Sequence, residues 1–247
     1  MRLDAALAQL NPHFTSLSDT PALEAQLLIA HLFNKPRAWV LAHPEVELLP
    51  AQEQELARYS ARRQSGEPLP YILGHWEFFN LDFLVTSAVL IPRPETELLV
   101  ETALEHLPPG KPLRVLDLGT GSGCIAVTLA YELPHARITA TDVSRAALEV
   151  AQLNVKRHNL GNTVRLIRSD LLSAVGSPFS AIVANLPYIC TGDMPGLQPE
   201  VSRFEPRQAL DGGADGLDII RRLVDRAPEL LPPGGGLSLE IGLGQAS

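Results

Sequence analysis

The chain has 247 residues, of which 45% are hydrophobic and 19% are charged, and its formal net charge at pH 7 is −8. This is the composition of a globular protein of one or two domains. The acidic balance argues against nonspecific nucleic-acid binding, which depends on clustered Lys and Arg. Two cysteines make neither a disulfide framework nor a zinc ligand set, and the seven histidines lack metal-like spacing.

No apolar run approaches the ~20 residues that span a bilayer. Asp4 and Gln9 in the first ten residues do not suit a signal peptide. We therefore expect a cytoplasmic protein with no membrane contact and no metal site.

Residues 1–70 are predicted to form a helical domain. Thr20 and Pro21 are typical of a helix start, and Gly66 is typical of a helix end. Two interpretations stay open for this domain, a packing appendage or a recognition domain for a macromolecular partner.

Residues 71–93 have a different character and are predicted to form a β-hairpin linker. Much of the aromatic content is here, in a segment that contains Trp76, Phe78, Phe79, Leu81, Phe83 and Val85. Pro92 and Pro94 then fix an extended backbone ahead of a helix. On that helix Glu97, Glu101 and Glu105 follow i, i+4 spacing, which is typical of a solvated face.

From residue 113 onward, strand and helix patterns alternate. Such alternation predicts an α/β fold with a parallel sheet covered by helices on both faces. The predicted strands lie near 113–118, 136–142, 163–170, 179–185 and 236–241, and the predicted helices near 123–132, 144–158 and 216–230.

A glycine-rich loop follows the first of these strands and opens a helix. It reads Gly119, Thr120, Gly121, Ser122 and Gly123. Glycines allow tight turns and close approach to a ligand, and a helix N-terminus favours negative charge. The spacing differs from that of dinucleotide-binding loops, and the Lys of a phosphate-binding P-loop is missing. Taken alone, such a loop is weak evidence for any one ligand.

Acidic residues follow the next two strands. Asp142 lies about 20 residues beyond the glycine loop, where a carboxylate can accept hydrogen bonds from both hydroxyls of a ribose. The alternative for Asp142 is a helix N-cap, a role that Ser144 can also fill. Asp170, followed by Leu171, is a candidate to meet the amine of an adenine, with no pattern that decides it.

The fourth predicted strand ends in Asn185, Leu186, Pro187 and Tyr188. In an open parallel sheet this strand end and the glycine loop would lie side by side at the carboxyl edge, where ligands bind. The Asn185 amide oxygen and the Leu186 carbonyl are two neutral acceptors for one NH2 group, and the ring of Tyr188 can pack on a flat amide or base. The alternative is an ordinary turn built on Asn-x-Pro.

Together these motifs resemble a class I S-adenosylmethionine-dependent methyltransferase. More narrowly, the chain resembles the PrmC/HemK family, which methylates the glutamine of the Gly-Gly-Gln motif in peptide-chain release factors. The residues that carry the resemblance are Pro70-Tyr71-Ile72-x-Gly74, the run from Val89 to Glu97, the run from Asp117 to Gly123, and Arg203-Phe204-Glu205-Pro206.

The resemblance implies a Rossmann-like methyltransferase domain over 94–247, S-adenosyl-L-methionine as the cofactor and a release factor as the partner. Gly119 to Gly123, Asp142, Asp170, Leu171 and Asn185 would hold the donor. Asn185, the catalytic residue, would hold the target glutamine together with Leu186, Pro187 and Tyr188. The helices of 1–70 would engage the release factor. We expect a monomer that does not contact nucleic acid directly.

The chain departs from the family pattern in two places. Leu186 stands where the family usually has proline, although a backbone carbonyl is the acceptor in either case. The family's seven-stranded sheet also needs two strands beyond residue 241, so we expect the last strands to be truncated. These departures keep a donor-binding scaffold without catalysis as one alternative, and an adenine-N6 methyltransferase acting on DNA or RNA is another.

Overall fold

The computed structural model describes residues 1–107, 112–176 and 178–245. The chain divides into two compact units, Met1–Gly74 and His75–Ser247. The boundary expected after residue 70 therefore lies four residues later. The cause is a short helix, α5 (Leu69–Leu73), which ends where Gly74 takes a left-handed conformation with φ of 76°.

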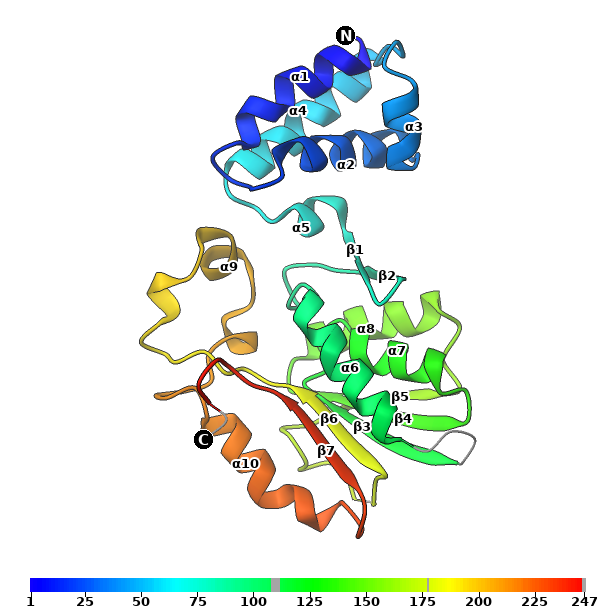
Figure 1. Ribbon diagram of the computed structural model, residues 1–247, viewed down its shortest axis with the longest axis vertical. Helices are drawn as coiled ribbons and strands as arrows, with labels where there is room; N and C mark the ends of the chain where they lie inside the picture. The colour runs from blue at the N-terminus through cyan, green and yellow to red at the C-terminus, as the bar shows by residue number, and fades with distance from the viewer. Residues whose placement is uncertain (108–111, 177, 246–247) are drawn as a thin grey trace. The chain divides into compact units, whose positions relative to one another are not determined.

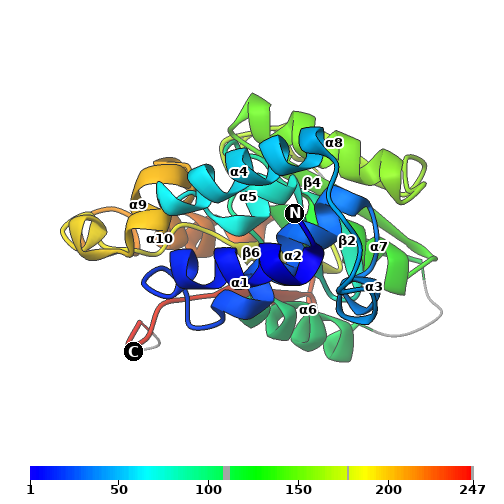
Figure 2. The same ribbon diagram turned by 90° about the horizontal axis from the view of Figure 1, so that it is seen from above.

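The first unit is helical, as the sequence predicts. Besides α5 it contains α1 (Leu3–Phe14), α2 (Pro21–Phe33), α3 (Arg37–Ala42) and α4 (Pro50–Gln64). Helices α1 and α2 lie side by side (Figure 1, Figure 2). A buried ion pair joins α4 to α2, in which Arg63 Nε donates to Glu24 Oε2 at 2.7 Å. Removal of one partner of a buried ion pair typically costs about 3–5 kcal/mol, because the other charge is left unpaired.

The second unit begins with the predicted hairpin, formed by β1 (His75–Phe78) and β2 (Leu81–Leu84). Its two turn residues, Phe79 and Asn80, both have positive φ, of 50° and 58°. Two-residue hairpin turns favour this backbone conformation. The Phe79 amide donates a hydrogen bond of 2.7 Å to Glu97 Oε1. The interpretation of Glu97 as part of a solvated face is therefore wrong, because its carboxylate holds the hairpin turn.

Five parallel strands form the central sheet in the order β5-β4-β3-β6-β7. All five lie where the sequence predicts them, and the α/β fold class is confirmed. Their bounds are β3 (Leu113–Leu118), β4 (Ala136–Asp142), β5 (Val164–Arg168), β6 (Ala181–Asn185) and β7 (Gly236–Glu240). Within the described residues the sheet has these five strands, with β5 and β7 at its edges.

Helices cover both faces of the sheet (Figure 1). Along β3, Val115 packs toward α6, α7 and α8, and the next residue, Leu116, packs toward α10. This alternation reflects the two-residue period of a strand. The bounds of these helices are α6 (Pro94–His106), α7 (Cys124–Glu132), α8 (Arg145–Arg157) and α10 (Asp218–Arg226).

Short helical segments connect β6 to β7 on either side of α10. They are η1 (Met194–Gly196), α9 (Pro199–Phe204), η2 (Arg207–Ala209) and η3 (Ala227–Glu229). The helix predicted over 216–230 is thus α10 followed by η3. Helix α10 begins two residues after the predicted start, because Gly216 has a φ of 79° that a helix cannot accommodate.

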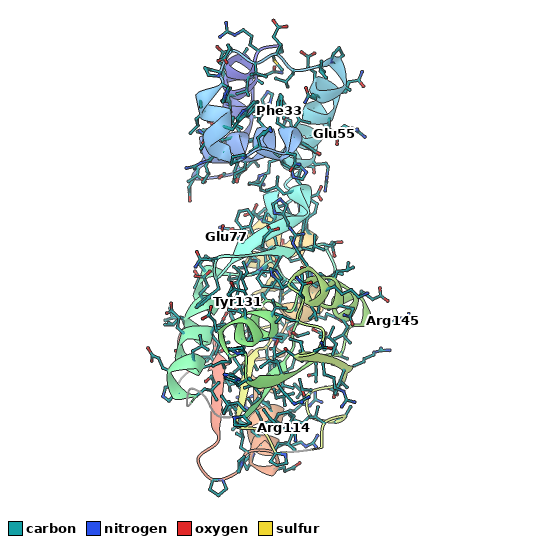
Figure 3. The ribbon with its side chains drawn as sticks, turned by 90° about the vertical axis from the view of Figure 1, so that its right-hand side faces the viewer. Phe33, Glu55, Glu77, Arg114, Tyr131 and Arg145 are labelled. Carbon is teal, nitrogen blue, oxygen red and sulfur yellow. The ribbon has the colours of Figure 1, made fainter. Side chains whose placement is uncertain are left out.

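The two ends of the sheet differ in character. At the amino end, the Arg114 guanidinium lies 5.2 Å from the centre of the Phe179 ring; Arg114 is labelled in Figure 3. At the carboxyl end, β3, β4 and β6 lead into the loops that carry the predicted site residues. In the described parts of the chain we find no helix with the length and apolar character needed to cross a membrane.

Candidate active site

The ends of β3 and β6 lie next to each other, as predicted. In their parallel register Leu118 is opposite Ala184, so the glycine loop and Asn185 emerge side by side. The chain order also reverses here, because β4 follows β3 on one side while β6 lies on its other side. Such a switch point is where open α/β sheets bind ligands.

The backbone of the glycine loop needs glycine at three positions. Gly119, Gly121 and Gly123 have φ values of 70°, 54° and 83°, in the left-handed region that L side chains rarely adopt. Between them, Thr120 and Ser122 are buried. The Thr120 hydroxyl donates a 2.6 Å hydrogen bond to Asp117 Oδ2. The loop is thereby fixed to the end of β3.

Asn154 on α8 supports this loop, a role that the sequence did not predict. Its side chain is fully buried, and Nδ2 donates to the carbonyl oxygens of Ser122 and Leu84, at 2.8 and 2.9 Å. Its Oδ1 accepts from the Leu84 amide at 2.7 Å. One side chain thus ties the glycine loop to strand β2. A polar residue among the buried Val150, Ala151 and Val155 is the pattern that could have identified it.

Asp142 meets the glycine loop from the neighbouring strand. Its Oδ2 accepts from the Gly121 amide at 2.9 Å, and Oδ1 accepts from the Ser144 amide at 2.8 Å. Burial raises the pKa of Asp142, while these backbone amides oppose that rise. Ser144 is the N-cap of α8, with its hydroxyl accepting from the Ala147 amide at 3.2 Å. The N-cap alternative for Asp142 is therefore wrong.

Asp170 and Leu171 lie on the rim of the same region. The exposed Asp170 accepts from Arg222 Nη2 at 2.8 Å. Leu171 has a φ of 46°, an uncommon value for a residue with a side chain. Strained backbone of this kind occurs often at ligand sites. Whether Asp170 contacts an adenine stays a prediction.

A single pocket contains most of the predicted residues. Gly123 and Tyr188 are the two that do not line it; those that do are Gly119, Thr120, Gly121, Ser122, Asp142, Asp170, Leu171, Asn185, Leu186 and Pro187. Walls that the sequence did not assign come from the segment that contains Pro206 and Gln208 and from Ala88, Val89, Leu90, Pro92, Arg93 and Thr96. Among the described residues, no group of three His, Cys, Asp or Glu side chains could hold a metal ion.

Glu205 joins those two walls. It is buried, it accepts from the Ile91 amide at 3.2 Å, and it forms an ion pair with Arg93. Burial raises the pKa of Glu205, and the charge of Arg93 opposes that rise. Two motifs more than 100 residues apart in sequence thus meet at one carboxylate.

Hydrogen bonds also fix the turn that follows β6, which contains Asn185 and Tyr188. Asn185 Nδ2 donates to Thr96 Oγ1 at 3.0 Å, and Thr96 Oγ1 donates to Glu240 Oε2 at 2.7 Å. Tyr188 Oη donates to Glu240 Oε1 at 3.1 Å. Burial, followed by the negative charge of Glu240, raises the pKa of Tyr188 to about 12, so the hydroxyl keeps its hydrogen at neutral pH.

Comparison with known families gives matches to both units. The PrmC N-terminal domain matches residues 5–74, and the methyltransferase small domain matches residues 94–194. The release factor glutamine methyltransferase of Moorella thermoacetica is 49% identical to this chain, over 92% of this chain and 80% of that protein. The one from Coxiella burnetii is 42% identical, over 100% of this chain and 88% of that protein.

Among solved structures, a methyltransferase from Pyrococcus furiosus is similar with a TM-score of 0.47 and 21% identity. The match covers 77% of this chain and 78% of that one.

Proposed function

Since the chain belongs to the release factor glutamine methyltransferase family, we propose that it methylates the side-chain amide nitrogen (N5) of the glutamine in the Gly-Gly-Gln motif of a peptide-chain release factor. S-adenosyl-L-methionine is the donor. The observation that carries the proposal is the position of Asn185 beside the glycine loop, with its NH2 group engaged by Thr96. Its amide oxygen is then the atom left to receive a substrate NH2.

The residues at the carboxyl edge fit this donor. Asp142 has lone pairs beyond those used by Gly121 and Ser144, as a ribose acceptor requires. Gly119 to Gly123 offer a close backbone approach, and Leu171 offers an apolar wall. Asp170 stands at the rim for the adenine amine. When bound, S-adenosylmethionine supplies an electrophilic methyl group on a sulfonium.

The work of the acceptor residues is positioning. The nitrogen of a primary amide is a weak nucleophile, because its lone pair is delocalised into the carbonyl. Asn185 Oδ1 and the Leu186 carbonyl would accept from its two hydrogens and favour the pyramidal geometry that attack requires. Tyr188 would pack on the plane of the amide. Orientation and electrostatic stabilisation of this kind can account for a large part of an enzyme's rate.

Leu186 is compatible with this arrangement. The acceptor at this position is a main-chain oxygen, which leucine provides as proline does, and Pro187 biases Leu186 toward an extended backbone. The Leu186 side chain is buried on the α10 side of the sheet, away from the face that carries Asn185. The substitution therefore alters packing and leaves the acceptor in place.

The remaining expectations concern the partner. The match of residues 5–74 to the PrmC N-terminal domain supports a role of this unit in engaging the release factor. The net charge of −8 supports a protein substrate over direct contact with nucleic acid. We propose that the protein acts as a monomer in the cytoplasm, where release factors work.

A transfer assay tests the proposal. Donor affinity is measured by calorimetry, and transfer of a labelled methyl group is followed to a release factor and to an adenine-containing DNA duplex. We expect label in the release factor, and none after its Gly-Gly-Gln glutamine is replaced by alanine. Donor binding without transfer would support a scaffold, and label in the DNA would support an adenine methyltransferase. Either result would overturn the proposal.

A further inference from the structure

Residues 185–188, which would hold the substrate amide in the proposed function, are called the acceptor turn here. Three side chains that are far apart in sequence form one series of hydrogen bonds next to it. Thr96 lies in the first turn of α6, Asn185 ends β6, and Glu240 ends β7. Asn185 and Glu240 are register partners on adjacent parallel strands, so their side chains point to the same face of the sheet. Helix α6 covers that face, and the Thr96 hydroxyl lies between them, with the residue 3% exposed.

The carboxylate determines the direction of every hydrogen bond in this series. An ionised Glu240 has no hydrogen to give, so the single hydrogen of the Thr96 hydroxyl must point to Oε2, 2.7 Å away. Thr96 Oγ1 can then only accept from Asn185. The atom of Asn185 that lies 3.0 Å from Thr96 must therefore be Nδ2.

The opposite orientation of the amide is disfavoured. It would place Asn185 Oδ1 against Thr96 Oγ1, two acceptors with no hydrogen between them. A buried polar atom left without its partner costs about 1–3 kcal/mol. Thr96 lines the pocket but is only 3% exposed, which limits the access of water that could supply the missing hydrogen.

Tyr188 holds the carboxylate from its other side. Its hydroxyl donates to Glu240 Oε1, the oxygen that Thr96 does not use. With both oxygens occupied, the Glu240 carboxylate is held at two points and cannot readily rotate away from Thr96. Two residues of the acceptor turn, Asn185 and Tyr188, are thus both attached to the end of β7.

We propose that Glu240 and Thr96 are positioning residues of the acceptor site, which fix the Asn185 amide with its oxygen toward the substrate amide. This inference rests on the proposed function. The orientation matters because a reversed Asn185 would present its own NH2 to the substrate NH2, a contact between two donors. Thr96 and Glu240 act through Asn185.

Two substitutions of one residue separate orientation from packing. Thr96→Val keeps the size of the side chain and removes the hydroxyl, whereas Thr96→Ser keeps the hydroxyl and removes a methyl group. We expect Thr96→Val to lower kcat about 10- to 100-fold, the range seen when a residue that orients a metal-binding side chain from behind is lost. Thr96→Ser should stay within about threefold, and donor affinity should change little in either variant.

Thr102→Val is the matched control, because Thr102 is the same residue type on the same helix, six residues or about 1.7 turns beyond Thr96. It should leave kcat unchanged. Glu240→Gln should lower kcat less than Thr96→Val does, because a glutamine can present either an oxygen or an NH2 group to Thr96. Equal losses in Thr96→Val and Thr96→Ser would show a packing role and overturn the proposal. Wild-type kcat in Glu240→Ala, which leaves the Thr96 hydroxyl without its acceptor, would contradict the role of Glu240.

A spectroscopic measurement tests the orientation without any reaction. In the 15N-labelled full chain, the Asn185 side-chain NH2 signal is identified by its loss in Asn185→Ala. We expect slow hydrogen exchange of this group in the wild type and in Thr96→Ser, and fast exchange in Thr96→Val. Equal exchange in all three would overturn the proposal. Slow exchange in a wild type that fails to methylate a release factor would retain the orientation and reject the proposed function.

Discussion

Gly119 and Leu186 face each other across the ends of β3 and β6, where a Cβ on Gly119 would lie 3.1 Å from Leu186 Cδ2. The same Cβ would lie 3.4 Å from the Asn185 carbonyl oxygen. The first strand end belongs to the proposed donor site and the second to the proposed acceptor site. The two proposed sites are therefore adjacent. A side chain added at Gly119 would displace Leu186 or the backbone at Asn185.

Gly119→Ala should weaken donor binding at least about tenfold, equivalent to ~1.4 kcal/mol. The physical reasons are the positive φ of 70°, which L residues avoid, and the close contact with Leu186. Calorimetric titration with S-adenosylmethionine measures the effect. Gly161→Ala is the matched control, because a Cβ there has no neighbour within 4 Å. Equal donor affinity in the two variants would contradict the assignment of the loop.

Leu186→Pro, which restores the usual family residue, should change methyl transfer by less than about tenfold, or ~1.4 kcal/mol in the activation barrier. The acceptor carbonyl is kept, and only buried packing on the α10 side is lost. Leu186→Ala is the control that removes packing without introducing proline. A hundredfold gain of activity on a release factor in Leu186→Pro would show that Leu186 impairs the site.

Asp142→Asn should weaken donor binding about 10- to 100-fold, since charge-assisted hydrogen bonds contribute ~1.5–3 kcal/mol each. Both carboxylate oxygens of Asp142 also accept from backbone amides, and the NH2 group of an asparagine would oppose one of them. Asp170→Asn at the exposed rim is the comparison, and we expect it to lose less donor affinity than Asp142→Asn. If Asp170→Asn has the larger effect on donor affinity, the ribose assignment of Asp142 is wrong.

Asp117 makes stability depend on pH. Burial first of all, and then the charge of Asp142, raise its pKa from 3.8 to about 7, although the Thr120 hydroxyl opposes the rise. The folded state thus binds the proton more tightly than the unfolded chain does. This contribution to stability is present below pH 4 and is lost as pH rises through about 7, by roughly 1.4 kcal/mol per pKa unit.

Asp117→Asn should abolish the loss of stability that Asp117 causes as pH rises. Denaturant titrations at pH 5 and pH 8 measure it, with the exposed Asp225→Asn as the control. From pH 5 to pH 8, the wild type should lose stability relative to Asp117→Asn. It should show no such change relative to Asp225→Asn. A constant difference between the wild type and Asp117→Asn would contradict the buried, proton-binding role of Asp117.

The elements of the sheet could be predicted from local patterns because each depends on its own run of residues. The apolar run from Ala181 to Ala184 forms a strand buried on both faces, and the turn at Asn185 follows from where that run stops. The glycine loop is equally local, since its three positive φ angles need glycine wherever the loop lies. The neighbouring positions of the two strand ends then followed from the rules for parallel sheets.

The residues that support the site could not be predicted in this way, because their partners are distant in sequence. Glu240 reaches Thr96 across 144 residues, and Asn154 reaches Leu84 across 70. The sequence alone does not distinguish a glutamate that binds a buried hydroxyl from a glutamate on the solvated face of a helix. Glu97 is an example. Its i, i+4 spacing with Glu101 fits an exposed helix face, but its side chain accepts a hydrogen bond from the Phe79 amide.

The most direct test of the proposed function is mass spectrometry of a release factor after incubation with the protein and S-adenosylmethionine. We expect the added mass of one methyl group on the side chain of the Gly-Gly-Gln glutamine. With Asn185→Ala the added mass should disappear, while much of the donor affinity is kept. A methyl group on any other residue would contradict the proposed function. A methyl group that persists on that glutamine with Asn185→Ala would contradict the role of Asn185.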